Sequence, residues 1–232
     1  MKGENKQRVA TQLQQRILSL DLLPGQPLDE VQLSRLYGLS RTPLREVLQR
    51  LAGEGYVTLE MHRGAHVSSM DLATMRNFFQ TAPMVYAAIS RLAVEQGTAS
   101  QLTTLKKIQQ RFRRAVEQGA KMAMVEHNHR FHEHIGIMAA SPYLLPSLNR
   151  LLIDHTRMSH RFYQTRSAAS QTRVTEACEQ HDAIITAIEN RSPSTAVELT
   201  LDHWELSRQE IDKYVLADSL PIDELETIEG VG

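Results

Sequence analysis

Apolar residues between Leu39 and Leu51 recur at the spacing that places them on one face of an amphipathic helix. The apolar positions of this stripe are Leu44, Val47, Leu48 and Leu51. The opposite face carries side chains of the types that reach base edges and phosphates in a DNA major groove, namely Arg41, Thr42, Arg45 and Gln49. Either Ser40 or Thr42 could cap the free N–H groups at the start of this helix, and the sequence leaves both open.

A second amphipathic stretch comes directly before this one. Residues 30–37 repeat apolar side chains at helical spacing, and Gly38 follows as the left-handed residue that commonly closes a helix. A tight turn at Leu39 and Ser40 then leads into the next helix, which predicts a helix-turn-helix. An ordinary helical hairpin has the same layout, so this pattern alone leaves DNA binding and simple packing equally open.

The flanking residues extend this pair of helices into a winged helix. Residues 6–20 have helical spacing, and the Pro24-Gly25 pair after them is a strong turn signal. Residues 56–61 alternate apolar and polar side chains as a half-buried strand does, and residues 65–68 return after a turn. That turn, the tip of the wing, consists of His62, Arg63 and Gly64. The tip could touch a phosphate or the minor groove, or it could be the solvated end of a stabilising ribbon.

From Met70 onward the pattern changes, because strand-like alternation gives way to successive helical stripes. We expect six helices there, separated by glycine, serine and proline positions, over residues 71–96, 101–118, 122–139, 143–165, 171–190 and 193–216. The expected fold class is therefore mainly α, with an N-terminal winged helix-turn-helix domain and an all-α six-helix bundle. The expected divisions are a DNA-binding domain at 1–70, a helical ligand-binding and dimerisation domain at 71–217, and an acidic, flexible tail at 218–232.

Composition and charge exclude some classes of protein. Hydrophobic residues make up 41% of the 232 residues, which excludes a disordered chain. The first residues lack the apolar core of a signal peptide, and no apolar run approaches the ~20 residues that cross a bilayer, so we expect no membrane association. Cys178 is the only cysteine, which excludes an intrachain disulfide and suits a reducing cytoplasm. The net charge is −1, with a slight basic excess over residues 1–70.

Motifs in the N-terminal region resemble the DNA-binding domain of the GntR family of bacterial transcriptional regulators. They include the runs Ser40–Glu46 and Arg63–Val67, in the right order within roughly residues 8–68. The resemblance implies contact with a double-stranded DNA operator through the first turns of the second helix, and entry of the wing tip into the minor groove. The expected DNA contacts are Arg35, Ser40, Arg41, Thr42, Arg45, Gln49, His62, Arg63 and Gly64. An arginine can fork onto guanine O6 and N7, and hydroxyls at a helix start suit phosphates.

A six-helix bundle behind a winged helix resembles the FadR subgroup of this family, which has the FCD-type helical effector domain. The resemblance implies a transcriptional regulator and not an enzyme, with a small-molecule effector and often a metal ion in the bundle. It also agrees with a homodimer on an operator with two-fold half-sites, because one recognition helix reads only a few base pairs. The sequence does not indicate which surface forms the dimer interface.

Three histidines lie on the core-facing stripes of three different predicted helices: His132, His181 and His203. Considered alone, each is more simply a core histidine with satisfied hydrogen bonds. The resemblance favours a metal site instead, because subgroup members place ligands at these positions, and imidazole suits zinc or nickel. The first ligand position departs from the subgroup, since Asn128 stands where an aspartate is common. A neutral amide is a weaker ligand than a carboxylate, so it lowers the expected metal occupancy.

The expected effector is a small organic acid that completes the coordination of this metal ion. The subgroup usually places an arginine and a glutamate in the first effector helix, but residues 80–86 contain neither. The candidates to replace them are Arg157, Arg161 and Tyr163. Two alternatives stay open: a helical metal-dependent hydrolase, which lacks a general base because Glu133 and Asp182 point off the ligand faces, and a DNA-binding protein with no small-molecule effector.

Overall fold

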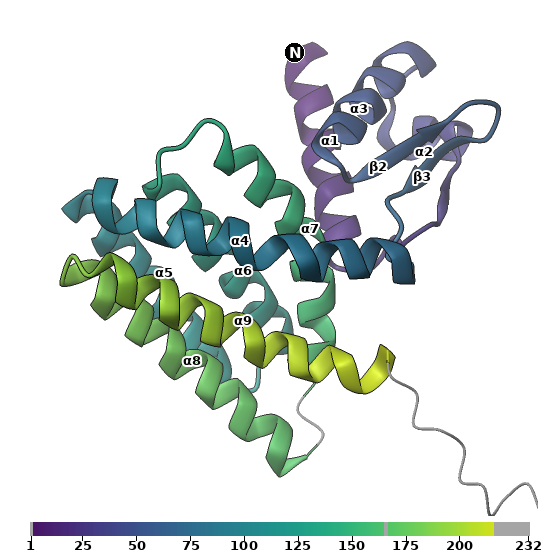
Figure 1. The fold of residues 1–232 in the computed structure, drawn as a ribbon. Coiled ribbons are helices and arrows are strands. Elements are labelled where there is room, and N and C mark those ends of the chain that lie inside the picture. Colours follow the sequence, from purple (N-terminus) through teal and green to yellow (C-terminus); the bar gives the residue numbers. More distant parts are fainter. Residues whose placement is uncertain (1, 165–166, 216–232) are drawn as a thin grey trace, which may run out of the picture.

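The computed structural model describes residues 2–164 and 167–215 and places them in two units that follow one another along the chain (Figure 1). Within these residues, the winged-helix unit contains α1 (Lys2–Leu18), β1 (Pro27–Leu28), α2 (Glu30–Tyr37), α3 (Arg41–Glu54), β2 (Val57–Glu60) and β3 (Gly64–Val67). The helical bundle contains α4 (Leu72–Gln96), α5 (Ala99–Glu117), α6 (Lys121–Met138), α7 (Leu144–Phe162), α8 (Ala168–Glu189) and α9 (Pro193–Val215).

An apolar core of its own holds the winged-helix unit together. The stripe predicted for α3 forms the centre of this core, and Leu44 and Leu51 are fully buried in it. Val9 and Leu13 of α1 belong to the same cluster of buried side chains. Burial of such a side chain contributes roughly 1.5–3 kcal/mol, so the stripe fixes which face of α3 is left for solvent.

The ends of α2 and α3 follow from the residues that stand there. The Asp29 side chain accepts hydrogen bonds from two backbone N–H groups in the first turn of α2, and Gly38 closes α2 at φ 64°. Ser40 occupies the N-cap position of α3 but makes no side-chain cap hydrogen bond. Gly55 closes α3 at φ 88°. Gly53 lies inside α3 and does not end it, because Gly55 supplies the left-handed residue two positions later.

The wing is a three-stranded antiparallel sheet in the order β1-β3-β2. In the predicted hairpin, Val57 pairs with Val67 and Glu60 with Gly64. The third strand, β1, was not expected, and its Pro27 lies opposite His66. Two residues are too few to show the alternation that identifies a strand, and proline at a sheet edge gives up no ladder bond.

The helical bundle is built around α4, which packs against α9, α6 and α7 (Figure 1). The remaining helices close the bundle through the pairs α5–α6, α5–α8, α6–α7 and α8–α9. All six predicted helices are confirmed, with ends no more than three residues from the expected ones. The fold class is confirmed as a winged helix-turn-helix followed by an all-helical domain. None of the helices in the described part is long and apolar enough to cross a bilayer. The tail predicted at 218–232 lies outside the described residues.

Polar contacts connect the two units, and most of them come from α7. The His160 Nε2 atom lies 2.7 Å from the Leu18 carbonyl oxygen at the end of α1. The Arg157 guanidinium donates to the Ser68 carbonyl oxygen, in the segment that joins the units, at 2.7 Å. The Arg150 side chain lies directly against Gly55. A Cβ atom added to Gly55 would come to 2.1 Å from Arg150 Cδ, which is too close for two non-bonded carbon atoms. The bundle therefore holds the winged-helix unit by a few placed groups from one helix.

A cleft of about 1090 Å³ lies between the units beside these contacts. Its walls come from α1 and the end of α3 on one side and from α6 and α7 on the other. Its lining mixes hydrogen-bonding groups such as Gln14 and Asn149 with charged groups such as Glu133. The buried apolar clusters of the two units share no member among the described residues, so the cleft separates two independent cores.

Candidate DNA-binding surface and histidine centre

All nine residues expected to contact DNA have exposed side chains or backbone. Arg35 lies on α2, and the others lie at the start and outer face of α3 or at the wing tip. His62 at the tip has φ 66° and Gly64 has φ 80°, as the tight turn of a hairpin requires. The structure thus leaves the whole predicted set accessible to solvent.

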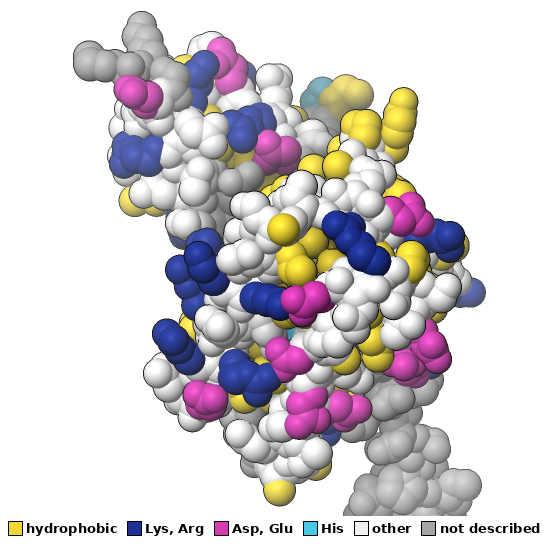
Figure 2. All heavy atoms as spheres, turned by 90° about the vertical axis from the view of Figure 1, so that its left-hand side faces the viewer, with side chains coloured by type: hydrophobic (Ala, Val, Ile, Leu, Met, Phe, Trp, Pro, Cys, Tyr) yellow, Lys and Arg dark blue, Asp and Glu magenta, His cyan; other side chains and the backbone are white. Residues whose placement is uncertain are grey.

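Acidic neighbours hold several of the basic side chains around α3. Arg45 Nε donates to Glu30 Oε2 at 2.9 Å, and Arg63 Nη1 lies 3.5 Å from Glu60 Oε2. Arg50 is bonded to Glu54 at 2.7 Å and also to Gln7, which directs it toward α1. Since these acids offset the basic side chains around α3, individually placed arginines, and not a general positive surface, are the candidates for DNA recognition. On the bundle side of the molecule, which Figure 2 shows, basic and acidic side chains are also interspersed.

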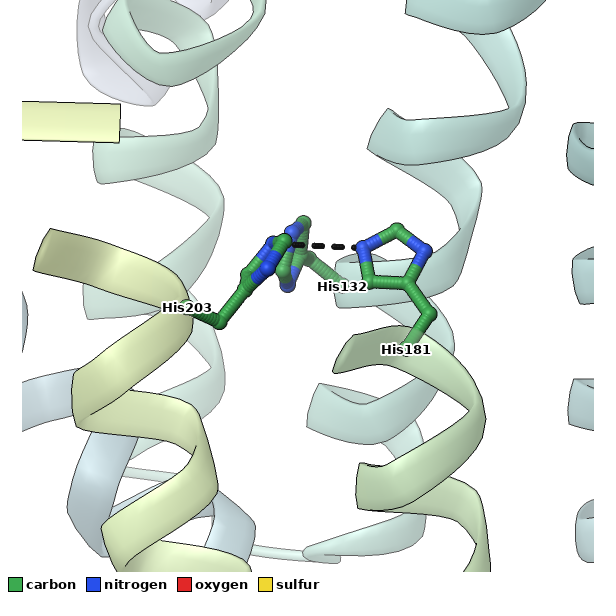
Figure 3. A group of neighbouring side chains, drawn as sticks. All are labelled: His132, His181 and His203. Atoms are coloured by element: carbon green, nitrogen blue, oxygen red, sulfur yellow. Dashed lines mark hydrogen bonds between the residues drawn. The ribbon is translucent and has the colours of Figure 1, made fainter. Parts of the chain in front are cut away.

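The three predicted histidines converge inside the bundle from α6, α8 and α9 (Figure 3). One ring nitrogen from each lies within 4.8 Å of the others. His181 is fully buried, and His132 and His203 are each 5% exposed. The Phe131 ring stacks on the His181 ring with centroids 3.8 Å apart and fixes its plane. The structure therefore brings the three side chains together, as a shared metal site would require.

With the oxygens of Gln109 and Gln180 both facing the rings, the hydrogen bonds of this centre require one more proton than two neutral rings can supply. His181 Nδ1 lies 3.0 Å from Gln109 Oε1, and His203 Nδ1 lies 2.9 Å from Gln180 Oε1. The Nε2 atoms of the two histidines face each other at 3.2 Å. Gln109 Nε2 donates to the Cys178 carbonyl oxygen, which fixes the amide so that its oxygen faces His181. A neutral imidazole has one N–H, so two rings serve two of these three contacts.

Burial opposes a positive charge on any of these rings. It holds the pKa of His132 and of His181 well below the usual range, with the neighbouring histidines adding to the effect. It also lowers the pKa of His203 to about 4. Near neutral pH the rings are therefore neutral. If each Nδ1–H donates to a glutamine oxygen, the two Nε2 lone pairs point at each other.

This arrangement fits a bound cation. Two imidazole nitrogens on one tetrahedral zinc ion lie ~3.3 Å apart, as follows from a Zn–N distance of ~2.05 Å, and the observed separation is 3.2 Å. His132 Nε2 and Asn128 Oδ1 are buried without a hydrogen-bond partner among the described residues. They stand one turn apart on α6 and offer a third nitrogen and an oxygen. Glutamine oxygens on Nδ1 are the kind of outer contact that orients metal-bound histidines.

Two further aromatic side chains adjoin the centre and were missed in the sequence. The His155 ring lies 4.9 Å from the His132 ring, and its Nδ1 atom lies 2.7 Å from the Tyr86 hydroxyl oxygen. Burial, with nearby His203 and His129, lowers the pKa of His155 to about 3. Leu148, Leu152 and His155 are spaced as one helical stripe, so this signal was present in the sequence. A cavity of about 10 Å³ lies between Tyr86 and His132, room for about one water.

The three residues expected to bind an effector are not gathered at the histidine centre. Arg157 is 2% exposed and is bonded to Asp154 and the Ser68 carbonyl oxygen. Arg161 is exposed at the end of α7. Tyr163 is buried against Phe112, with ring centroids 5.7 Å apart. This placement gives Arg157 a contact with the connecting segment and gives no support to its expected role in an effector pocket.

The acidic residues considered as general bases also lie elsewhere. Asp182 forms an ion pair with Arg113 on the surface of the bundle. Glu133 lines the cleft between the units. Among the other histidines of α6, His129 is bonded to Thr156 and His134 to the Gln101 carbonyl oxygen. A reacting water at the three-histidine centre would find neither carboxylate beside it.

Two family matches cover most of the chain. Residues 5–67 match the bacterial regulatory proteins of the gntR family, and residues 84–206 match the FCD domain. The second match covers the histidine centre and the first covers the helix-turn-helix. The families and relatives that match are transcriptional regulators and not enzymes.

Relatives and solved structures agree with these matches. The chain is 20% identical over 208 residues to the uncharacterized HTH-type transcriptional regulator YdhC of Bacillus subtilis, covering 89% of this chain and 90% of that one. It is 30% identical over 123 residues to the HTH-type transcriptional repressor RspR of Escherichia coli, or 51% of this chain and 54% of that one. The structure of E. coli McbR/YncC superposes with a TM-score of 0.76 at 18% identity, over 90% of this chain and 98% of that one. The chain belongs to the GntR family of transcriptional regulators, with an N-terminal helix-turn-helix domain and a C-terminal FCD domain.

Proposed function

We propose that this protein is a homodimeric regulator that binds operator DNA with two-fold half-sites in the cytoplasm and responds to a small organic acid. The response depends on a transition-metal ion, zinc or nickel, at the three-histidine centre. The domain limits of this proposal are 1–70 for DNA binding and 71–217 for effector binding and dimerisation. The observation that carries the metal site is the convergence of three buried histidines, whose ring nitrogens lie within 4.8 Å of one another.

DNA recognition is assigned to the exposed face of α3, the start of α3 and the wing. Arg41 and Arg45 are placed to read base edges, because an arginine that forks onto guanine contributes roughly 1–3 kcal/mol of discrimination. The Ser40 hydroxyl has no cap bond and is therefore available to a phosphate. Arg35 on α2 is suited to a backbone contact that sets the register. A second copy of the chain supplies the other half-site.

In the bundle, His132, His181 and His203 would hold the metal ion, with Asn128 as a weaker oxygen ligand. Gln109 and Gln180 keep the Nε2 atoms of His181 and His203 directed at it. The bound ion would supply the positive charge that attracts the carboxylate of an effector. Tyr86, bonded to His155, adds a hydroxyl at the edge of the same centre.

Control of DNA affinity requires an effector to favour one of two arrangements of the protein. Helix α7 is the candidate to connect the histidine centre to the winged-helix unit. It contacts the centre through His155 and the segment that joins the two units through Arg157. A shift of α7 would change the position of the winged-helix unit, and with it the separation of two recognition helices in a dimer.

The chain contains its own reporter for a test of the metal site. Trp204 is the single tryptophan, it follows His203, and it lies 5.8 Å from the His155 ring. We expect about one zinc or nickel ion per chain after reloading, and quenching of Trp204 fluorescence by nickel. His132→Ala, His181→Ala and His203→Ala should each lose both signals, and His134→Ala, on the same helix as His132, should keep them. A wild-type protein that takes up no metal after reloading would refute the metal site.

A regulator without an organic effector remains a second candidate, because the cavity beside His132 has a volume of only about 10 Å³. An organic acid would require this cavity to expand, whereas an ion and one water would not. Operator affinity should be measured with the metal-free protein, with the metal-loaded protein, and with the metal-loaded protein across a panel of small carboxylic acids. A shift with at least one acid supports the effector, and a shift with metal alone supports the second candidate.

A further inference from the structure

The pairing of Arg45 with Glu30 joins the two helices of the helix-turn-helix on its exposed face. Arg45 Nε donates to Glu30 Oε2 at 2.9 Å. The Arg45 side chain is 64% exposed, whereas the Glu30 side chain is 27% exposed, so the carboxylate lies beneath the arginine that it holds. Arg45 thus has its Nε edge occupied, and its two terminal nitrogens have no partner among the described residues.

The contact fixes which edge of the guanidinium can meet a base. An arginine has five N–H donors in a planar fork and can present either its Nε edge or its two terminal nitrogens. Because Glu30 occupies Nε, only the two terminal nitrogens of Arg45 remain for a forked contact with an acceptor pair. The arginine can then meet a guanine only end-on, and its direction of approach is set.

The backbone around Glu30 holds its carboxylate in a fixed position beside Arg45. Glu30 is the first residue of α2, and the preceding Asp29 caps this helix with bonds of 2.7 Å and 3.1 Å to backbone N–H groups. A carboxylate in the first turn is stabilised by the free N–H groups of the helix. The other acid that pairs with a basic side chain across the unit, Glu46 on α3, reaches Lys6 of α1 at 2.7 Å and not an expected DNA contact.

A carboxylate on a DNA-facing surface carries an electrostatic cost, because it repels phosphates and weakens binding to every sequence alike. We propose that Glu30 is a positioning residue for base recognition, which lowers general DNA affinity and raises the discrimination made by Arg45. This inference rests on the proposed DNA-binding function and adds to it the residue that sets the geometry of one base contact.

The test compares binding preferences of the full-length protein and its variants on a library of random-sequence duplexes. Arg45→Ala first identifies the base positions that Arg45 reads. At those positions we expect Glu30→Ala to lose at least ~5-fold of the wild-type discrimination, the lower end of what one forked contact contributes. Glu30→Gln keeps an oxygen that can accept from Nε, so it should retain most of the preference while binding random-sequence duplex more tightly.

Matched controls separate geometry from charge. Glu46→Ala removes the same charge from the same surface and should leave base discrimination at wild-type level. Glu30→Asp keeps the charge and the helix start but withdraws the acceptor by one methylene, so it should broaden the preference even if Glu30→Ala folds poorly. Unchanged discrimination in Glu30→Ala and Glu30→Asp, or equal broadening in Glu46→Ala, overturns the inference and leaves the DNA-binding function intact. A wild-type protein that enriches no sequence overturns both.

Discussion

Arg157 Nη1 donates a hydrogen bond of 2.7 Å to the Ser68 carbonyl oxygen, across the boundary between the bundle and the segment that joins the two units. The same guanidinium is paired with Asp154 one turn earlier, and both side chains are almost completely buried. Asp154 also accepts from Arg150 at 3.2 Å, and Arg150 lies against Gly55 of the winged-helix unit. One buried carboxylate thus organises two arginines that meet the neighbouring unit.

Replacing Arg157 by alanine should be strongly destabilising. The change leaves the buried Asp154 carboxylate without its closest cationic partner, which typically costs ~3–5 kcal/mol of unfolding free energy. Urea denaturation of the full chain measures this loss. Arg161→Ala, at an exposed position on the same helix, should change the free energy by less than ~1 kcal/mol. An Arg157→Ala loss no larger than that of Arg161→Ala would contradict the buried pair.

His160 should make stability depend on pH. Burial is the main cause that lowers the pKa of His160, and its bond to the Leu18 carbonyl oxygen opposes this only in part. The unfolded chain therefore binds a proton more readily, and stability contributed by the neutral ring is lost as pH falls below the unfolded value of ~6.5. His160→Gln keeps an N–H donor and removes the titration.

The measurement for His160 is the free energy of unfolding of wild type and His160→Gln between neutral and mildly acidic pH. The wild-type protein should lose more stability than the variant over this range. The difference between the two proteins cancels the contribution of the other histidines. Parallel curves would show that His160 binds protons equally well in the folded and unfolded chain.

Gln109 should influence metal affinity without being a ligand. Its amide oxygen faces His181 Nδ1 and its nitrogen is bonded to Cys178, so it orients the ring from behind. Loss of such an outer contact typically weakens metal binding by ~10–100-fold. We expect this weakening for Gln109→Leu in nickel titrations followed by Trp204 fluorescence, and no change for Gln110→Leu, the exposed neighbour on α5. Equal affinities would show that Gln109 does not orient His181 for metal binding.

Arg41 and Arg35 should differ in the kind of DNA binding that they support. Arg41 begins α3 and is placed to read a base, so Arg41→Ala should cost ~1–3 kcal/mol on the selected operator and relax one base position. Arg35 lies on α2 and is suited to a phosphate, so Arg35→Ala should weaken binding to all duplexes and reduce the salt dependence by about one unit. Binding to operator and random duplex at several salt concentrations separates the two, and identical profiles would refute the assigned roles.

The helical pattern was enough to predict the fold because each amphipathic stripe records which face its helix buries. Leu44, Val47 and the rest of the α3 stripe identified the recognition helix, and His132, His181 and His203 were recognised as core-facing. The strand β1 escaped because two residues carry no period. Its pairing with β3 depends on where the chain folds back, which a local pattern does not contain.

The surroundings of the histidines could not be predicted in the same way. Which glutamine meets which ring depends on the angles at which α5, α8 and α9 cross, and these follow from packing over the whole bundle. Arg157 shows the same limit: it was expected to bind an effector, but its observed partner, the Ser68 carbonyl oxygen, lies 89 residues away along the chain. The spacing of apolar residues predicts which face of each helix is buried. It does not predict which residue a side chain on that face will contact.

The cleft between α1 and α7 has a consequence for the choice of operator. Because the apolar cores on its two sides are separate, tilting one unit against the other disturbs a few polar bonds and leaves both cores intact. In the proposed dimer, the preferred spacing between half-sites would then be adjustable at a small cost in free energy, and would not be a fixed length. Operators that differ slightly in this spacing would then differ in affinity, because each would strain the contacts between the two units to a different degree. One protein could therefore occupy several promoters to different extents.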